Sequence, residues 1–217
     1  MAASMDRSAH LQQPWRVHAL AYDFELQDVW DFGIVSPAGD PGGSSREGAG
    51  LSTFIAVLDE VMREAMNSLG PTGLLFRLRG LLGRAFHWDD EARNKAVPAH
   101  ESLRHRLAEA ERLEQPWTQG DDVEIRPVDF GGFQLVYRRG DEALYELSNA
   151  TVHALMHLGW TPHDGGFAPR MAVYAKKKGL LGHVYMALIK PFRYAIVYPA
   201  MQRAVRRAWQ ARSSAKP

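Results

Sequence analysis

The stretch "EALYELSNATVHALMHLGW" at residues 142–160 decides how the second half of the chain is expected to fold. Its bulky apolar residues begin at odd positions, as at Tyr145, and later lie at even positions. Side chains alternate between the two faces of a strand, so this change of phase requires one extra residue near 148–150. We therefore predict a single long strand that a bulge bends strongly. Asn149 and Thr151 are expected to satisfy the backbone groups that the bulge disrupts.

Segments on both sides of this stretch also alternate with a period of two residues, which is typical of strands. Turn residues separate them: Arg139-Gly140-Asp141 precedes the stretch, and "TPHDGG" at 161–166 follows it. The pattern predicts an antiparallel sheet. The other segments predicted as strands are "WRVHALAYDF" (15–24), "DVEIRPV" (122–128), "GFQLVYRR" (132–139) and "FAPRMAVYAK" (167–176).

Apolar residues at spacings of three and four predict an amphipathic helix over residues 51–69. The preceding "SPAGDPGGSSREGAG" at 36–50 has almost nothing to bury and is predicted as a flexible loop. Further helices are predicted at 72–86, 100–113 and 179–212. Pro191 and Pro199 should kink the last one, because each removes a backbone donor.

The heptad "GLLGRAF" at 80–86 returns almost unchanged as "GLLGHVY" at 179–185. In the second copy Gly179 lies where a strand passes into a helix, and glycine there allows a tight turn and close backbone approach. Three lysines precede it, so the free N–H groups at that helix start are also a candidate anion site. A phosphate-binding loop needs G-x-x-x-x-G-K-[ST], which the sequence lacks. We interpret the repeat as two similar turns.

The chain has 217 residues, of which 46% are hydrophobic and 24% are charged, enough for one domain with a substantial core. We predict a single domain over 1–217, whose core of sheet and C-terminal helix spans about 122–212. Cysteine is absent, which excludes disulfides, thiolate metal sites and cysteine nucleophiles and agrees with a reducing compartment. The first residues contain no apolar signal segment, so a cytoplasmic location is expected.

The net charge of +1 conceals an uneven distribution. Between Gly165 and Pro217 there are eleven Lys or Arg and no acid, while the first 164 residues hold the other 15 bases and all 25 acids, a net charge of −10. Two such parts attract each other, or the basic part meets an anionic partner. The candidates for contact with an anionic surface are Lys176, Lys177, Lys178, Arg203, Arg206 and Arg207.

Two segments carry a resemblance to a known family: "ELSNATVHALMHLGW" at 146–160 and "GLLGHVYMALIKPFRYAIVYP" at 179–199. The shared pattern is a Gly-Leu-Leu-Gly turn, an aromatic residue three positions later, Pro191-Phe192 and a hydrophobic helix. Over about residues 122–210 the chain resembles an uncharacterised bacterial family of the START-like superfamily, also called SRPBCC or polyketide-cyclase-like. Members often stand alone or follow a short-chain-dehydrogenase-like domain. This sequence has no such domain, so no cofactor is implied.

The resemblance implies an α+β helix-grip fold, in which a curved antiparallel sheet wraps around the long C-terminal helix and leaves a mostly apolar cavity. A hydrophobic small molecule or lipid in that cavity is the first functional hypothesis. Core packing is the alternative role for each candidate ligand-binding residue. These candidates are Tyr145, Asn149, His153, Met156, His157, Trp160, Tyr185 and Phe192.

His153 and His157 have the H-x-x-x-H spacing that binds zinc on a helix. On a strand, however, four residues span roughly 13 Å, too far for one ion, and Ala154 replaces the glutamate of H-E-x-x-H. No metal site is therefore expected, and a histidine pair on the outer or rim face of the sheet is the ordinary alternative. A single histidine acting as general base near a pocket stays a candidate.

Two further functional hypotheses stay open. The aromatic and basic residues of 179–212 suit a helix lying on an anionic membrane or partner surface, but not a spanning helix, since Lys190 and Arg193 interrupt it. Nucleic-acid binding is not expected, because no recognition motif accompanies the charge. The third hypothesis is a cyclase- or isomerase-type enzyme using a pocket histidine or tyrosine, and the sequence favours binding over catalysis.

Overall fold

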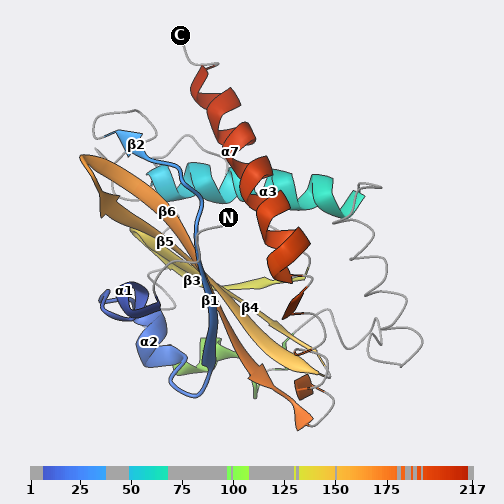
Figure 1. Cartoon of the computed structure of the whole chain (residues 1–217). Helices are drawn as coiled ribbons and strands as arrows, with labels where there is room; N and C mark the ends of the chain where they lie inside the picture. Colours follow the sequence, from blue (N-terminus) through green and yellow to red (C-terminus); the bar gives the residue numbers. More distant parts are fainter. Residues whose placement is uncertain are drawn as a thin grey trace.

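The computed structural model in Figure 1 shows an α+β fold, an open, curved antiparallel sheet with helical segments on both faces and a helix at the C-terminal end. The structure describes residues 7–37, 49–67, 97–98, 100–107, 130, 132–149, 151–179, 182–183, 187, 190–191 and 193–214.

Six strands of the described residues make up the sheet, in the spatial order β1-β6-β5-β4-β3, with the short β2 also pairing with β6. The strands are β1 (Glu25–Asp31), β2 (Ser36–Pro37), β3 (Gln134–Arg139), β4 (Glu142–Ser148), β5 (Val152–His163) and β6 (Gly166–Lys177). These pairings are antiparallel. Both predicted turns are present but shorter than predicted, at Gly140-Asp141 and Asp164-Gly165, and the flanking residues belong to the strands. Gly140 and Gly165 have positive φ angles of 39° and 80° there.

The stretch at 142–160 is not one bent strand, as predicted, but two strands joined by a tight turn. β4 pairs with β5 along its whole length. Asn149 closes the turn: its backbone N–H donates to Val152 O at 3.0 Å, and its side-chain oxygen accepts from the N–H groups of Thr151 and Val152, both at 2.9 Å. The change of hydrophobic phase therefore marks a reversal of the chain and not a bulge.

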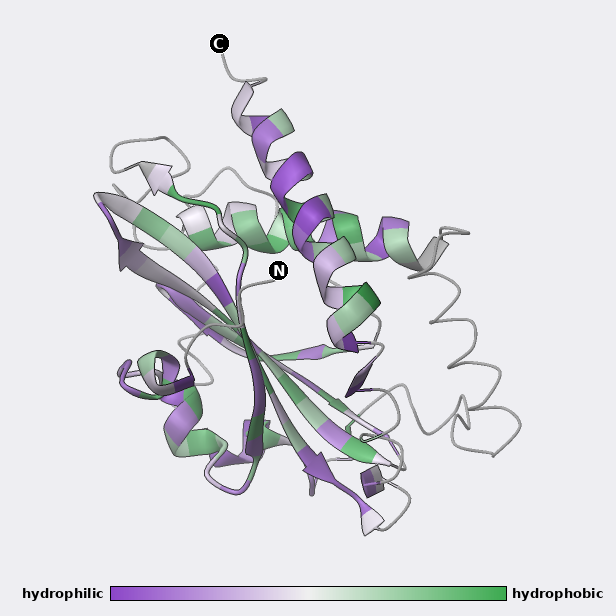
Figure 2. Cartoon of the chain, in the orientation of Figure 1, coloured by the Kyte–Doolittle hydropathy of each residue, from purple (hydrophilic) through white to green (hydrophobic). Residues whose placement is uncertain are grey.

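Helical segments cover both faces of the sheet. They are α1 (Arg7–Leu11), α2 (Arg16–Leu20), α3 (Ala49–Asn67), the 3-10 turn η1 (Leu103–Arg106), the π-helical turn η2 (Arg193–Val197) and α7 (Tyr198–Ser214). One face, here called the α7 face, packs against α3 and α7 (Figure 1). The opposite face, here called the α2 face, packs against α1, α2 and η1. Hydrophobic and hydrophilic residues both occur along the strands in Figure 2, and an apolar cluster covers each face of the sheet.

The helix predicted at 51–69 is confirmed over residues 51–67 as part of α3, whose Phe54 and Leu58 are fully buried, and residues 68–69 lie outside the described part of the chain. The strand predicted at 15–24 is wrong. Residues 16–20 form α2, because the buried Val17 and Leu20 lie on one side of a helical turn, and the strand β1 begins only at residue 25.

The helix predicted at 100–113 is wrong for its described part, residues 100–107. Only the short turn η1 forms there, and Leu107 is extended with φ −77° and ψ 136°. Side chains of η1 bind distant backbone: Arg104 donates to Leu135 O at 2.9 Å, and Arg106 donates to Leu20 O at 2.6 Å. These tertiary bonds outweigh local helix propensity.

The Gly-Leu-Leu-Gly segment after β6 contains two glycines with structural reasons to be glycine. Gly179 has φ of +60°, and a Cβ on Gly182 would lie 2.2 Å from Thr151 O. The interpretation as a turn is confirmed for this copy. Other predicted segments lie outside the described residues: 72–86 with the first copy of the repeat, 108–113, 122–128 and the middle of the predicted loop, 38–48. The two ends of that loop belong to β2 and α3.

The C-terminal segment changes its winding directly before α7. Pro199 has no N–H, so the regular hydrogen-bond ladder is broken near it, and residues 193–197 adopt the wider π-helical turn η2. The disturbance predicted at Pro199 therefore takes this form. Around Pro191 only isolated residues belong to the described part of the chain.

Candidate functional site

A row of side chains crosses the α7 face from β1 to β3. The register pairs that place them side by side are Asp28↔Val173, Val173↔Met156, Met156↔Tyr145 and Tyr145↔Leu135. Most of the row is apolar or aromatic, whereas Asp28 is an acid that is only 4% exposed. A buried carboxylate on an apolar face is costly unless it is hydrogen-bonded, so the partners of Asp28 define the candidate site.

Three side chains from the C-terminal segment supply those partners and form, with Asp28, the Asp28 cluster. Arg193 donates to Asp28 Oδ2 at 2.5 Å, and Tyr198 donates to the same oxygen at 3.0 Å. Tyr194 donates to Oδ1, and Arg193 Nε donates to the Tyr198 hydroxyl at 2.8 Å. Trp30 packs on Tyr198 with ring centroids 3.9 Å apart. Burial and the charge of Asp28 raise the pKa of Tyr194 and Tyr198, so both phenols keep their protons.

The α7 face is packed with aromatic rings at one end and carries smaller apolar residues at the other. Near α3 the rings of Phe32 and Phe54 lie 5.0 Å apart, and those of Trp160 and Trp209 lie 5.8 Å apart. The protein's own aromatic side chains fill this end. Toward the other end of the strands the half-buried Leu147 and Ala154 lie near the buried Val152 and Ala175, and Val173 within the row is also half-buried. Room for a ligand is therefore to be sought beside the Asp28 row.

Three of the predicted ligand-binding residues share the α7 face: Tyr145, Met156 and Trp160. Tyr145 and Met156 are neighbours in the row, whereas Trp160 lies at the packed end. Burial raises the pKa of Tyr145 to about 12, so its phenol is neutral at ordinary pH. The predicted candidates Tyr185 and Phe192 lie outside the described residues. Asn149, as shown above, belongs to the β4–β5 turn.

His153 and His157 lie on the α2 face, opposite to α7. Each bonds a glutamate one diagonal step away on β4: His157 Nε2 lies 3.0 Å from Glu142 and His153 Nε2 lies 3.3 Å from Glu146. Both glutamates and both histidines are four residues apart, so the same contact repeats along the ladder. All four side chains are buried under helical segments, and the histidines cannot serve a ligand on the α7 face.

Two histidines from the N-terminal helices join His157 and form with it the imidazole cluster. The ring of His10 lies 5.3 Å from that of His18 and 5.4 Å from that of His157. Tyr174 on β6 bonds His10 Nε2 at 2.7 Å and His18 Nδ1 at 3.3 Å. Burial, with the neighbouring histidines and Arg170, lowers the pKa of His10 to about 3. Burial also lowers the pKa of His157 despite its bond to glutamate.

Glu142 is the acceptor that ties this cluster to the sheet. Its carboxylate accepts the backbone N–H of Arg16 at 3.0 and 3.2 Å and the Tyr137 hydroxyl at 2.9 Å, in addition to its contact with His157. Burial and the charge of Glu142 raise the pKa of Tyr137, which keeps its proton. One carboxylate thus fixes the start of α2 against β3, β4 and β5.

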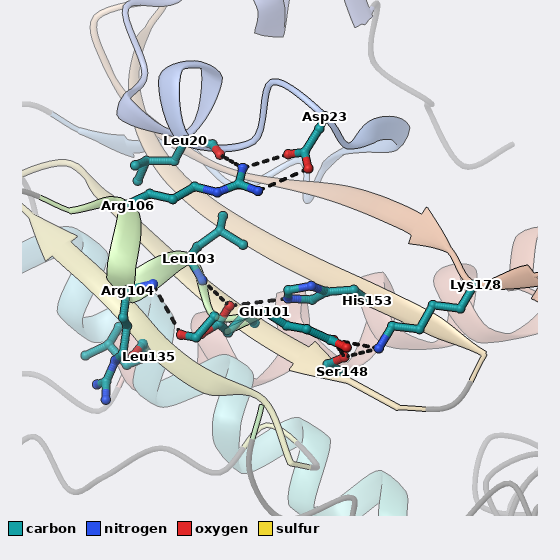
Figure 3. A network of polar contacts seen from close by, with 12 residues as sticks. Leu20, Asp23, Glu101, Leu103, Arg104, Arg106, Leu135, Ser148, His153 and Lys178 are labelled. Carbon is teal, nitrogen blue, oxygen red and sulfur yellow. Dashed lines mark hydrogen bonds and ion pairs between the residues drawn. The ribbon is translucent and has the colours of Figure 1, made fainter. Parts of the chain in front are cut away.

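Figure 3 shows a third polar network, where η1 meets the sheet. Lys178 donates to Glu101 at 2.6 Å and to Ser148 at 2.8 Å, and Ser148 donates to Glu101 at 2.7 Å. A serine beside a lysine is one arrangement for nucleophilic catalysis. Here both Lys178 and Ser148 donate hydrogen bonds to Glu101. Although burial acts to raise it, the pKa of Glu101 is lowered by Lys178 and Ser148, so Glu101 is a poor base.

The remaining contacts of this network are structural. Glu146 accepts hydrogen bonds from the Ser102 hydroxyl and from Leu103 N–H, the latter at 2.9 Å. Arg106 pairs with Asp23 at 2.6 Å, as Figure 3 also shows. The network therefore joins η1 to β4 and to the segment that enters β1.

Four of the six candidate residues for an anionic surface bind within the protein. The ion pairs are Lys176–Asp23 at 2.9 Å, Lys177–Glu25 at 2.8 Å and Lys178–Glu101 at 2.6 Å. Arg206 donates to Phe32 O. Arg203 and Arg207 are exposed on α7 and have no polar partner within the described ranges. Attraction between the basic C-terminal part and the acidic remainder accounts for the three lysine pairs.

In the part of the chain that the structure describes, no group of three or more His, Cys, Asp or Glu side chains could hold a metal ion. No helix in the same ranges combines the length and apolarity needed to cross a bilayer.

Neither the Asp28 cluster nor the imidazole cluster is apparent from local sequence patterns. Asp28 and Arg193 are 165 residues apart, and His10 and Tyr174 are 164 residues apart. One usable signal exists. Glutamates at 142 and 146 face histidines at 153 and 157 with equal spacing, which indicates diagonal pairs once the turn at Asn149 is recognised.

Comparison with protein families matches residues 21–200 to the family described as "Protein of unknown function (DUF2867)". The matched region contains the six strands and all members of the Asp28 cluster, whereas His10 and His18 precede it. No curated protein and no solved structure matches the chain. Because the match covers most of its length, the chain belongs to the DUF2867 family.

Proposed function

We propose that the protein binds a small apolar molecule or a lipid against the α7 face, with the Asp28 cluster holding the ligand's polar group. The observation that carries the proposal is the row in which Asp28 stands beside Val173, Met156 and Tyr145. Sites for such ligands are mostly apolar with a few placed polar groups, and this row has that composition. In this proposal the fold is of the START-like, helix-grip type, and the protein acts in the cytoplasm.

Half-buried residues in and beside the row favour this position for the ligand. Leu147, Ala154 and Val173 keep part of their apolar surface exposed. Covering such surface stabilises a complex by about 25 cal/mol per Å². A ligand at this place gains that energy without rearranging the aromatic packing around Trp160.

The Asp28 cluster offers both kinds of hydrogen-bonding group. Asp28 accepts, Arg193 donates, and the phenols of Tyr194 and Tyr198 can do either. Tyr194 is only half-buried, so a ligand hydroxyl or a protonated ligand carboxyl can take its place as the donor to Asp28, while Arg193 and Tyr198 still satisfy the other oxygen. Arg193 and Tyr194 also lie on the π-helical turn η2, a conformation that is frequent at functional sites.

Native mass spectrometry of the protein purified from its own host tests whether an apolar molecule co-purifies. Binding of a fluorescent fatty acid tests its position. Ala154→Phe fills the half-buried surface and should weaken binding at least about tenfold, which is ~1.4 kcal/mol. The matched control is Ala19→Phe, on the exposed side of α2, which should leave binding unchanged. Unchanged binding in folded Ala154→Phe, or no bound molecule in either experiment, contradicts the proposal.

Ionic strength separates this site from docking on an anionic surface through Arg203 and Arg207. Screening weakens exposed charge–charge contacts steeply as salt rises, whereas burial of an apolar ligand hardly changes. Fatty-acid binding should therefore persist at high salt. Binding that disappears at high salt would favour surface docking.

A further inference from the structure

The α2 face carries a feature that the proposed ligand site does not use. The short helices α1 and α2 rest on this face through apolar anchors, through the imidazole cluster and through Glu142. The apolar anchors are Trp15, Val17, Leu20 and Ala21. We infer that α1 and α2 form an acid-sensitive latch, which stays closed while His10 and His157 are neutral and is released when these histidines take up protons.

His10 lies where a positive charge would be unsupported. Its Nε2 bonds to the Tyr174 hydroxyl, while its buried Nδ1 has no hydrogen-bond partner. The titratable groups that face it are His18 from α2, His157 from β5, and Tyr174 and Arg170 from β6. Apart from the neutral phenol, each of these is cationic or becomes cationic on protonation. Burial and repulsion therefore both oppose a proton on this ring.

His157 differs, because it contacts the carboxylate of Glu142, and Asp141 adds a weaker attraction. That carboxylate is shared with the Tyr137 hydroxyl and with the backbone N–H of Arg16. Burial, with repulsion from His18, outweighs both acids and lowers the pKa of His157. Glu142 consequently orients a neutral imidazole ring of His157. If His10 were protonated, a proton on His157 would also be repelled by the charge on His10.

Release of the helices exposes the histidines to water, where their pKa returns to about 6.5. The open form then binds more protons than the closed form at every pH below that value. The closed form is fully favoured above pH 6.5. As pH falls from 6.5 toward the bound pKa of His10, about 3, the closing equilibrium weakens about tenfold per pH unit through His10. The lowered pKa of His157 acts in the same direction. At pH 5 the loss is about 30-fold for His10.

Hydrogen–deuterium exchange of the full chain, corrected for intrinsic rates and read by mass spectrometry, tests the latch. Peptides covering residues 7–20 should lose protection at least about tenfold per pH unit below 6.5, while β5 stays protected. His10→Gln keeps a hydrogen-bond partner for Tyr174 but does not titrate. The variant should therefore lack the contribution of His10, which is about tenfold loss of protection per pH unit. The matched control is His100→Gln, a histidine whose side chain is 81% exposed, which should keep the wild-type response.

Equal protection of residues 7–20 at pH 7 and pH 5 would overturn the latch, as would an unchanged pH dependence in His10→Gln. Parallel loss in β5 would also overturn it, since that indicates global unfolding. If His10→Gln does not fold, NMR titration of wild-type His10 decides: a ring that titrates near 6.5 with the helices still docked contradicts the inference. None of these measurements involves a ligand, so their outcome is independent of the proposed binding function.

Discussion

The two faces of the sheet are built from alternate residues of the same strands, yet they are stabilised differently. Along β5, Leu158 and Trp160 pack into the aromatic core of the α7 face, while His153 and His157 pair with glutamates on the α2 face. Apolar burial depends little on pH, whereas buried imidazoles and carboxylates depend on it strongly. The contrast shows that one strand can pack apolar and aromatic side chains on one face and pair titratable side chains on the other.

The largest effect is expected on the α2 face. Glu142→Ala leaves the N–H of Arg16, the Tyr137 hydroxyl and His157 without their buried acceptor, and should lower the free energy of unfolding by about 3–5 kcal/mol. Urea unfolding at pH 7 measures this loss. The control Glu60→Ala removes a pair with Arg212 that is nearly half exposed and should cost under about 1 kcal/mol. Similar losses in both variants would contradict the claim that the buried Glu142 stabilises the fold more than an exposed glutamate does.

A somewhat smaller and pH-independent effect is expected on the α7 face. Leu158 is fully buried there, so Leu158→Ala should cost about 2–5 kcal/mol through lost burial and the cavity left behind. The same loss should appear at pH 7 and at pH 5, because no titrating group of the imidazole cluster lies on this face. A difference between the two pH values larger than about 1 kcal/mol would break the contrast between the faces.

The smallest expected effect is the loss of stability when the pH is lowered without any substitution. The pKa of His10 is about 3 in the folded protein and about 6.5 when unfolded, so the unfolded chain gains protons first as pH falls. Stability that is complete above pH 6.5 should therefore decrease, by about 2 kcal/mol at pH 5 through His10. Urea unfolding of the wild type and of His10→Gln, each at pH 7 and at pH 5, isolates the loss of unfolding free energy that is due to His10. An identical pH response in the two proteins would assign the acid sensitivity to other groups.

Elements governed by local periodicity could be predicted from the sequence. The spacing within α3 is helical throughout, and glycines at 140 and 165 mark hairpins of standard length. The turn at Asn149 was harder to predict, because a bulge and a chain reversal change the hydrophobic phase in the same way. Residues 15–24 were predicted as a strand, and this prediction failed for a related reason. Val17 and Leu20 fit a helix in a short window, and the acceptor that fixes the start of α2 is Glu142, 126 residues from Arg16.

The candidate site could be predicted only in part. The alternation of β5 indicates that Met156 and Trp160 share one face, which the structure assigns to α7, and that the two histidines share the other. Nothing local indicates that Asp28 would meet Arg193, Tyr194 and Tyr198, since that contact depends on how the C-terminal segment crosses β1. Long-range side-chain partners follow from the completed fold and not from sequence spacing.

The most direct test of ligand binding on the α7 face uses a fatty acid with a photoreactive diazirine group, cross-linked to the protein and mapped to single residues by peptide fragmentation. Successive residues of β5 and β6 point to opposite faces, so each cross-link reports its face. We expect cross-links at Ala154, Met156 and Val173. Cross-links confined to Leu155, His157 and Tyr174 would place the ligand under α1 and α2 and would contradict the proposed site.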